Sequence, residues 1–392
     1  MMNYERVIVR VLPEAMRSAL IRVRSSKGEV AIATTAAIKC GTDFVIIINH
    51  FEFDRESRQS ENPVQVVLRE AMRNPASDHS RYGSCAATTF GNGLLELLLL
   101  DDGRLWATYW NPDGTMAPVT VVFEPFGRSI SLPGDGGSHL DSRLLPRTSQ
   151  LIGGDVAMSA WNNLHVALLG CGRSGSLIAD AMCAQGLRRL TLVDDDLLEA
   201  GNLDGMTVVG TKDLGRPKAD SLGRALCERF PQLAVSAVND RFPTIRSVIA
   251  VAAADVLITA IDLDRPRLAA NRFAQSMLQL HLDLGTGAGP RGTQAADVRL
   301  LTPYGRCLLC LGGVPDLRLN VSRRPGVSSR SINAIAVHLG CQLLMNALGE
   351  REPASTWLRV SQTRSPVAVA SQMMTPLQSD VNCPWCSGIV AN

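Results

Sequence analysis

The chain contains 392 residues, of which 46% are hydrophobic and 19% are charged, and its formal net charge is +2 at pH 7. This composition is ordinary for a soluble protein with two domains. It excludes a membrane-spanning protein, because no apolar run approaches the ~20 residues that cross a bilayer. The net charge provides no basic stripe, so nucleic acid is not expected as a partner.

The start of the chain and the cysteine content indicate the compartment. The first residues lack the apolar core of a signal peptide, so a cytoplasmic location is expected. In a reducing compartment the 10 cysteines are expected to be buried thiols or metal ligands and not disulfides.

Residues 1–135 have the pattern of a separate accessory domain of the α/β or α+β class. Short apolar runs predict strands, and residues 64–73 are expected to form a helix. His50 and His79 each stand apart from other ligand-type residues, so neither is expected to bind a metal. The strands are expected at residues 6–11, 29–33, 44–48, 94–100, 105–109 and 119–123.

The second domain, residues 136–392, is introduced by a linker rich in Gly and Pro at 132–138. Its clearest feature is the GxGxxG spacing of Gly170, Gly172 and Gly175, between an apolar run and an apolar helical pattern. Glycine is needed in such a turn because a side chain would hold the backbone away from a phosphate. The helix that follows offers free N–H groups to the same phosphate.

The next apolar run, residues 190–193, ends in three aspartates. A Rossmann-like unit has a ribose-binding carboxylate at this strand end, and Asp194 is the first candidate. These features alone are compatible with either NAD or ATP. The Asn202-Leu203 pair and the turn that ends in Lys218 favour ATP, because a dehydrogenase has no evident use for a lysine in this turn.

The glycine loop, the DxD strand end, the Asn-Leu pair and the GxPK turn together resemble the ThiF/MoeB superfamily, whose members adenylate ubiquitin-like or sulfur-carrier proteins. The resemblance covers residues 140–390. It implies a Rossmann-like α/β domain with a mostly parallel sheet that binds ATP and Mg²⁺ and works as a homodimer. It also implies that Asp194 accepts hydrogen bonds from the ribose, that Asp196 and Asn202 line the nucleotide, and that Lys218 neutralises phosphate charge.

Two further roles follow from the resemblance. Superfamily members have an arginine upstream of the first strand that reaches the triphosphate of the partner subunit, and Arg147, with Arg143 behind it, matches that position. They also have an aspartate at the end of the third strand that holds magnesium. Here residues 255–261 are the expected strand and Asp262 matches the aspartate, with Asp264 as the reserve candidate.

One motif departs from the family. The family pattern NLxRQ reads NLDGM at residues 202–206, so Gly205 and Met206 replace an arginine and a glutamine. The missing arginine contacts phosphate in the family. Arg216, Lys212 or an arginine from the partner subunit takes its place, or adenylation is weakened.

Beyond the third strand, a fourth strand is expected at 281–284 and a helix at 332–348, which would bury Cys341 in the core. The glycine-rich residues 285–292 are expected to form a flexible loop against which the C-terminal tail of another protein could lie.

Two CxxC pairs, Cys307 with Cys310 and Cys383 with Cys386, predict a metal site. Four thiolates suit tetrahedral zinc, and a closed Cys₄ shell would make the ion structural. The zinc would connect the C-terminal tail to the body of the domain. Two separate redox pairs are the alternative, but a thioredoxin-like context is absent.

In the resembling enzymes, the loop after the first CxxC pair carries a cysteine that captures the activated carboxyl group. Here Ser322 stands in that context, and no cysteine occurs at residues 311–340. Two interpretations stay open. Ser322 could attack the acyl-adenylate and form an oxyester, or the covalent step could be lost and the enzyme could stop at the adenylate.

The expected function is therefore ATP-dependent activation of the C-terminal carboxylate of a ubiquitin-like or sulfur-carrier protein, followed by transfer to a conjugating enzyme. An NAD-dependent oxidoreductase is one alternative, but it leaves Lys218, Asp262 and the four cysteines unexplained. A catalytically reduced adaptor is another, favoured by Gly205, Met206 and Ser322. The first domain faintly resembles JAB/MPN metalloprotease-like domains without their HxH zinc signature, and is expected to be an inactive scaffold or an unrelated accessory domain.

Overall fold

The chain divides into two compact units, Met1–Ser138 and His139–Asn392, and each is described by itself. The computed structural model describes residues 6–11, 15, 19, 31–40, 43–52, 65–70, 93–99, 105–111, 113, 115–117, 119–122, 130–131, 161–288, 293–303, 305–311, 328–349, 354–364, 367–374 and 383.

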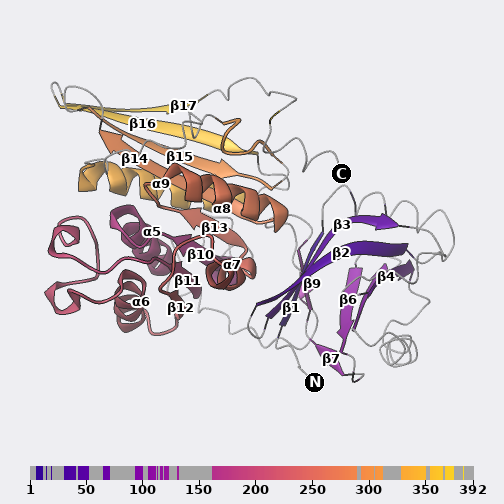
Figure 1. Ribbon diagram of the computed structural model, residues 1–392. Coiled ribbons are helices and arrows are strands. Elements are labelled where there is room, and N and C mark those ends of the chain that lie inside the picture. Colours follow the sequence, from indigo (N-terminus) through magenta and orange to yellow (C-terminus); the bar gives the residue numbers. More distant parts are fainter. Residues whose placement is uncertain are drawn as a thin grey trace. The chain divides into compact units, whose positions relative to one another are not determined.

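The described part of the first unit contains a nine-stranded mixed sheet (Figure 1). Its strands are β1 (Arg6–Val11), β2 (Ala31–Cys40), β3 (Asp43–Glu52), β4 (Gln65–Glu70), β5 (Leu94–Leu99), β6 (Leu105–Trp110), β7 (Met116–Ala117), β8 (Val119–Val122) and β9 (Ile130–Ser131). Their order in the sheet is β7-β6-β5-β4-β2-β3-β1-β8-β9. All six expected strands are confirmed, with shifts at their ends that are largest for β2.

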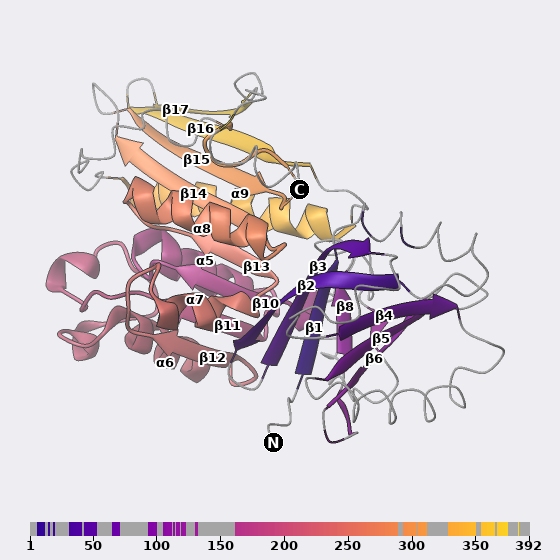
Figure 2. The same cartoon turned by 45° about the vertical axis from the view of Figure 1, so that its right-hand side comes forward.

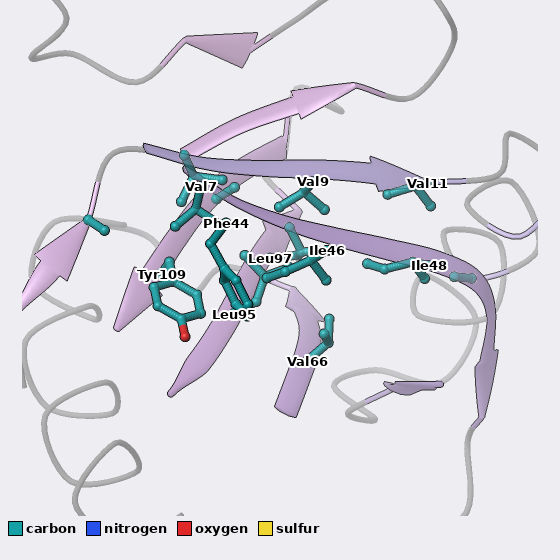
Figure 3. Close-up of a cluster of buried hydrophobic side chains, with 14 residues drawn as sticks. Val7, Val9, Val11, Phe44, Ile46, Ile48, Val66, Leu95, Leu97 and Tyr109 are labelled. Atoms are coloured by element: carbon teal, nitrogen blue, oxygen red, sulfur yellow. The ribbon is translucent and has the colours of Figure 1, made fainter. Parts of the chain in front are cut away.

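One core cluster of the first unit lies on one face of this sheet, because alternate residues of a strand point to the same side. Val7 and Val9 of β1, Ile46 of β3, and Leu95 and Leu97 of β5 gather in one buried cluster (Figure 3). Strands far apart in the sequence thus share one apolar surface.

The helix expected at residues 64–73 is wrong, because β4 occupies this segment and pairs in parallel with β5. Val66 is fully buried and belongs to the same cluster as Leu95 (Figure 3). A β-branched residue packs well on a pleated surface, and the neighbouring strand supplies backbone hydrogen bonds. Tertiary pairing therefore overrides the local helical pattern.

The second unit is built on an eight-stranded sheet with helices on both faces (Figures 1 and 2). Its strands are β10 (His165–Leu169), β11 (Arg189–Val193), β12 (Ala234–Val238), β13 (Val256–Thr259), β14 (Leu280–Ala288), β15 (Gln294–Leu301), β16 (Thr356–Arg364) and β17 (Val367–Met373). The order is β12-β11-β10-β13-β14-β15-β16-β17. The first five strands in this order are parallel to one another. Each of the last three strands pairs antiparallel with the strand before it.

Five helices of eight or more residues cover this sheet in the described part of the unit: α5 (Arg173–Ala184), α6 (Lys218–Arg229), α7 (Ile245–Ala252), α8 (Asp264–Ser276) and α9 (Arg330–Gly349). Ala167 and Leu169 of β10 pack in one cluster with Val251 of α7 and with Ala270 of α8. The central strand β10 is buried along its whole length, as expected for a parallel strand covered on both faces. Cys341 of α9 is 1% exposed, which confirms its predicted place in the core.

The chain leaves β10 toward β11 on one side and later returns to place β13 on the other side. In open α/β sheets, ligands bind outside the carboxyl ends of the strands at such a switch in strand order. Gly170, Asp194 and Asp262 all follow the carboxyl ends of these strands.

The flexible loop expected at residues 285–292 is corrected in part. Residues 285–288 belong to β14 and pair with residues 294–297 of β15, while residues 289–292 lie outside the described ones. Glycine lowers strand propensity, but the ladder with β15 satisfies the backbone groups here.

None of the described helices has the length and apolar character required to cross a bilayer.

A buried carboxylate, Asp283 of β14, lies in the core of the second unit. Arg267 of α8 donates to both of its oxygens, at 2.9 Å and 2.6 Å, and Arg299 of β15 donates to Oδ2 at 3.0 Å. Burial alone would raise the pKa of Asp283, but the two guanidinium groups outweigh it and hold that pKa well below its usual range. The ionised carboxylate therefore joins α8, β14 and β15.

A chain of hydrogen bonds runs from this carboxylate through His281. Thr259 donates its hydroxyl proton to Asp283 Oδ1 at 2.7 Å, so its oxygen accepts from Nε2 of His281 at 2.9 Å. Nδ1 of His281 accepts from the side-chain amide of Asn271 at 3.1 Å, whose oxygen accepts from the Leu308 N–H at 2.8 Å. The imidazole is neutral, and burial is the largest cause that lowers its pKa from 6.5 to about 4.

This histidine should make the stability of the protein depend on pH. Its pKa is lower in the folded state, so between pH 6.5 and about 4 the unfolded chain binds one more proton. The free energy of unfolding should therefore fall as the pH falls through this window, by about 1.4 kcal/mol per pH unit from His281 alone.

We expect His281→Gln to lose this part of the slope in urea unfolding measured at several pH values from 4.5 to 7.5. The matched control is His338→Gln, which replaces an exposed histidine of α9 and should retain the wild-type slope. Equal slopes for His281→Gln and the wild type would contradict the neutral, buried histidine.

Candidate functional site

The glycine loop begins where β10 ends. Gly170 has φ +92° and a Cβ there would lie 2.5 Å from the carbonyl oxygen of Ala260, whereas a Cβ at Gly175 would overlap the carbonyl oxygen of Gly170. These two glycines are required by the packing of the protein itself. A Cβ at Gly172 would meet nothing within 4 Å. Space is thus open at the N-terminus of α5, as a phosphate-binding loop requires.

Asp194 ties this loop to the end of β11. Its Oδ2 accepts the N–H of Cys171 at 2.6 Å and its Oδ1 accepts the N–H of Asp196 at 2.9 Å. Burial raises the pKa of Asp194, and the two N–H groups oppose that shift. Both oxygens therefore bind backbone, while the side chain of Asp196 is 65% exposed.

The GxPK turn lies alongside the residues that follow β11. The N–H of Leu198 donates to the oxygen of Arg216 at 2.8 Å, and the N–H of Gly215 donates to the oxygen of Leu198 at 2.9 Å. Gly215 has φ +77°, which favours glycine. This pairing brings Lys218, the first residue of α6, back to the strand end, where its backbone N–H donates to the oxygen of Asp196 at 2.9 Å.

The side chain of Lys218 is 10% exposed, and its Nζ lies 2.7 Å from Oδ2 of Asp196. The two predicted nucleotide-binding residues are therefore in direct contact. The lysine stem is packed in the protein while its charge is held at the carboxyl end of β11, close in the sheet to the glycine loop that follows β10.

The segment from 202 to 206 forms a turn beside α5. Asn202 uses its side-chain oxygen to accept the N–H of Glu199 at 2.9 Å. Gly205 and Met206 are buried, and Met206 is 4% exposed. Met206 is therefore a core residue and offers no polar group to a nucleotide.

The loop between β13 and α8 carries the two predicted magnesium candidates. Asp262 is exposed, and within the described parts of the chain its carboxylate forms no ion pair. Asp264 is the first residue of α8 and lies 3.2 Å from Nη1 of Arg267, the arginine that also holds Asp283. Asp262 is the carboxylate that can accept a cation, since Asp264 is already paired.

Arg173 directly follows Gly172 at the start of α5 and is a site residue that the sequence pattern did not indicate. Its Nη2 lies 2.9 Å from Oδ1 of Asp204. The only signal in the sequence is an arginine within a glycine-rich turn, and the pairing with residue 204 depends on the tertiary fold.

Three of the four predicted zinc ligands are described, and they lie together. The Sγ of Cys307 is 3.6 Å from that of Cys310 and 3.7 Å from that of Cys383, and the three sulfur atoms all lie within 4.8 Å of one another. Tetrahedral zinc with Zn–S bonds of about 2.3 Å requires sulfur atoms roughly 3.8 Å apart, whereas a disulfide requires about 2.05 Å. The cluster thus fits zinc ligation and not a disulfide.

Five of the residues singled out in the sequence lie outside the described residues: His79, Arg143, Arg147, Ser322 and Cys386. Their predicted roles stay predictions.

Comparison with known proteins places this geometry in a family. Residues 146–383, more than half of the chain, match the model of the ThiF family. The chain is 30% identical over 162 residues to the SAMP-activating enzyme E1 of Haloferax volcanii, an overlap of 39% of this chain and 57% of that protein. It is 27% identical over 125 residues to the sulfur carrier protein ThiS adenylyltransferase of Escherichia coli, an overlap of 31% and 50%. The chain thus spans about half the length of these relatives.

Among solved structures, the crystal structure of Escherichia coli MccB covers 65% of this chain and 75% of its own, with a TM-score of 0.51 and 21% identity. At this level of sequence identity the likeness shows a shared fold and nothing more. Because the family match covers the glycine loop, the GxPK turn and Asp262, the chain belongs to the ThiF family.

Proposed function

We propose that this protein is an ATP-dependent adenylyltransferase that activates the C-terminal carboxylate of a ubiquitin-like or sulfur-carrier protein. The observation that carries the proposal is the contact between Lys218 and Asp196 at the strand end beside the glycine loop. An NAD-dependent oxidoreductase has no role for this lysine. The names of the two relatives, which refer to activation of SAMP and adenylation of ThiS, agree with the proposal.

In the proposed reaction, a carboxylate oxygen of the carrier attacks the α-phosphorus of ATP. One new bond forms between that oxygen and the α-phosphorus, the bond from the α-phosphorus to the bridging oxygen breaks, and its electron pair leaves with pyrophosphate. Each chain residue has a defined task. The N–H groups at the start of α5 bind phosphate, and Lys218 offsets charge that develops on the leaving group. Asp194 holds the loop through the N–H of Cys171 and accepts hydrogen bonds from the ribose, and the exposed Asp196 lines the nucleotide with Asn202.

Magnesium bound with ATP supplies further charge neutralisation, and Asp262 would hold it because its carboxylate is exposed at the end of β13. Arg147 would reach the triphosphate of a partner subunit in a homodimer. Ser322 would then capture the activated carboxyl as an oxyester, with AMP as the leaving group, before transfer to a conjugating enzyme.

A second function, an adaptor without turnover, is favoured by one observation. Met206 is buried and Gly205 has no side chain, so two polar groups of the family pattern are missing from the site. An adaptor would bind the carrier protein without releasing pyrophosphate.

Replacement of Lys218 tests adenylation. We expect Lys218→Ala to lower ATP–pyrophosphate exchange roughly 100-fold, because the positive charge that stabilises the departing pyrophosphate is lost. The assay uses the full chain with Mg-ATP, labelled pyrophosphate and a set of ubiquitin-like and sulfur-carrier proteins. Arg246→Ala is the control, since Arg246 is exposed on α7 and has no assigned role in the site. Wild-type exchange in Lys218→Ala would refute the assigned role, and carrier binding without exchange in the wild type would favour the adaptor.

Replacement of Ser322 tests the covalent step. Intact-mass analysis of the chain with Mg-ATP and an accepted carrier should show an adduct that resists thiol reductants and is cleaved by strong base. Ser322→Ala should abolish the adduct and retain pyrophosphate exchange, and Ser328→Ala is the control at a nearby serine. Pyrophosphate release without an adduct in the wild type would mean that the enzyme stops at the adenylate.

Zinc is proposed as a structural ion at Cys307, Cys310, Cys383 and Cys386. We expect about one zinc ion per chain by elemental analysis, and Cys310→Ser should lower both the zinc content and, by roughly 5 °C, the melting temperature. Cys227→Ser is the control, because Cys227 donates to the carbonyl oxygen of Leu233, away from the cluster. Full zinc content in Cys310→Ser would contradict the assignment.

A further inference from the structure

Arg173 lies across Gly205, the position at which the family pattern has an arginine. A Cβ built at Gly205 would come within 2.6 Å of Nε and 2.5 Å of Cδ of Arg173. A side chain at position 205 and the observed position of Arg173 therefore exclude each other. Gly205 is the residue that makes room for this arginine.

Two partners hold the guanidinium of Arg173 in place. Its Nη2 lies 2.9 Å from Oδ1 of Asp204, and its Nη1 donates to the carbonyl oxygen of Ser328 at 3.4 Å. A guanidinium has five N–H donors, so these contacts leave donors for a further ligand. The side chain is 35% exposed and begins at the residue after Gly172, where the loop is open.

We infer that Arg173 supplies the positive charge that contacts the phosphates of ATP, in place of the side chain that Gly205 lacks. The inference rests on the proposed function and names a further residue of the same site. Arginine binds phosphate through paired N–H donors, and such charge-assisted bonds are about twice as strong as neutral ones.

The competing contact is weak. Asp204 is 69% exposed, so its ion pair with Arg173 is screened by solvent. A triphosphate carries several charges and would be held against the loop backbone, so it outcompetes a single exposed carboxylate. In this arrangement Asp204 keeps the arginine near the loop until the nucleotide binds.

Other cations in the region are less suited to this task. Lys212 is 65% exposed and already pairs with Glu228. Arg216 is exposed on the turn before Pro217, whereas Arg173 is covalently part of the loop that is proposed to bind phosphate. The family pattern has its arginine at position 205, and this chain has one at position 173. The positive charge is therefore kept, but α5 carries it.

The test measures the affinity of the full-length chain for Mg-ATP and for adenosine, which lacks phosphate, by isothermal titration. Arg173→Gln should weaken ATP binding roughly 10- to 100-fold and leave adenosine binding unchanged. Arg246→Gln, which removes an exposed arginine of α7, should bind both ligands as the wild type does.

A reciprocal exchange provides the sharper result. Arg173→Gly alone should lose ATP affinity, and the double variant Arg173→Gly with Gly205→Arg should recover it to within about threefold. Thermal unfolding of each variant controls for folding. Wild-type ATP affinity in a folded Arg173→Gln variant would overturn the inference.

The same measurements separate this inference from the proposed function. If the wild type binds ATP and Lys218→Ala binds it more weakly while Arg173→Gln does not, the role of Arg173 alone is refuted. If the wild type does not bind ATP, both the proposed function and the role of Arg173 are refuted.

Discussion

The second unit depends on the buried carboxylate of Asp283. An ionised group in the core costs several kcal/mol unless it is fully paired, and here Arg267 and Arg299 satisfy it. Arg267 also pairs with Asp264 in the first turn of α8, two residues after Asp262. Loss of either arginine would leave an uncompensated buried charge and release the helix that sets the position of the candidate magnesium ligand.

The same polar network connects distant parts of the unit. From Asp283 it continues through Thr259 and His281 to Asn271, which accepts the N–H of Leu308 between two cysteines of the thiol cluster. The proposed zinc site is thus joined to the sheet by directional bonds as well as by apolar packing. Such a network specifies one arrangement because every broken bond leaves a buried polar group unsatisfied.

The candidate nucleotide site contains two kinds of residue: some shape the loop, and others are open to a ligand. Gly170, Gly175 and Asp194 are engaged by the backbone of the protein itself, so their main task is to shape the loop. Gly172 and Asp196 are left open toward solvent. The relation of Arg173 to Gly205 follows the same principle, since the absence of one side chain provides the space that another occupies.

The sequence alone determined the family, the strand–turn–helix around the glycine loop, the lysine turn and the cysteine pairs, because these signals are local and depend on fixed residue spacings. Only the tertiary structure decided features that depend on partners distant in the chain. Residues 65–70 form a strand because they pair with β5 and share its apolar core. Residues 285–288 form a strand because they pair with β15. The ionised Asp283, the neutral His281 and the position of Arg173 over Gly205 likewise arise from contacts between segments that no local pattern reveals.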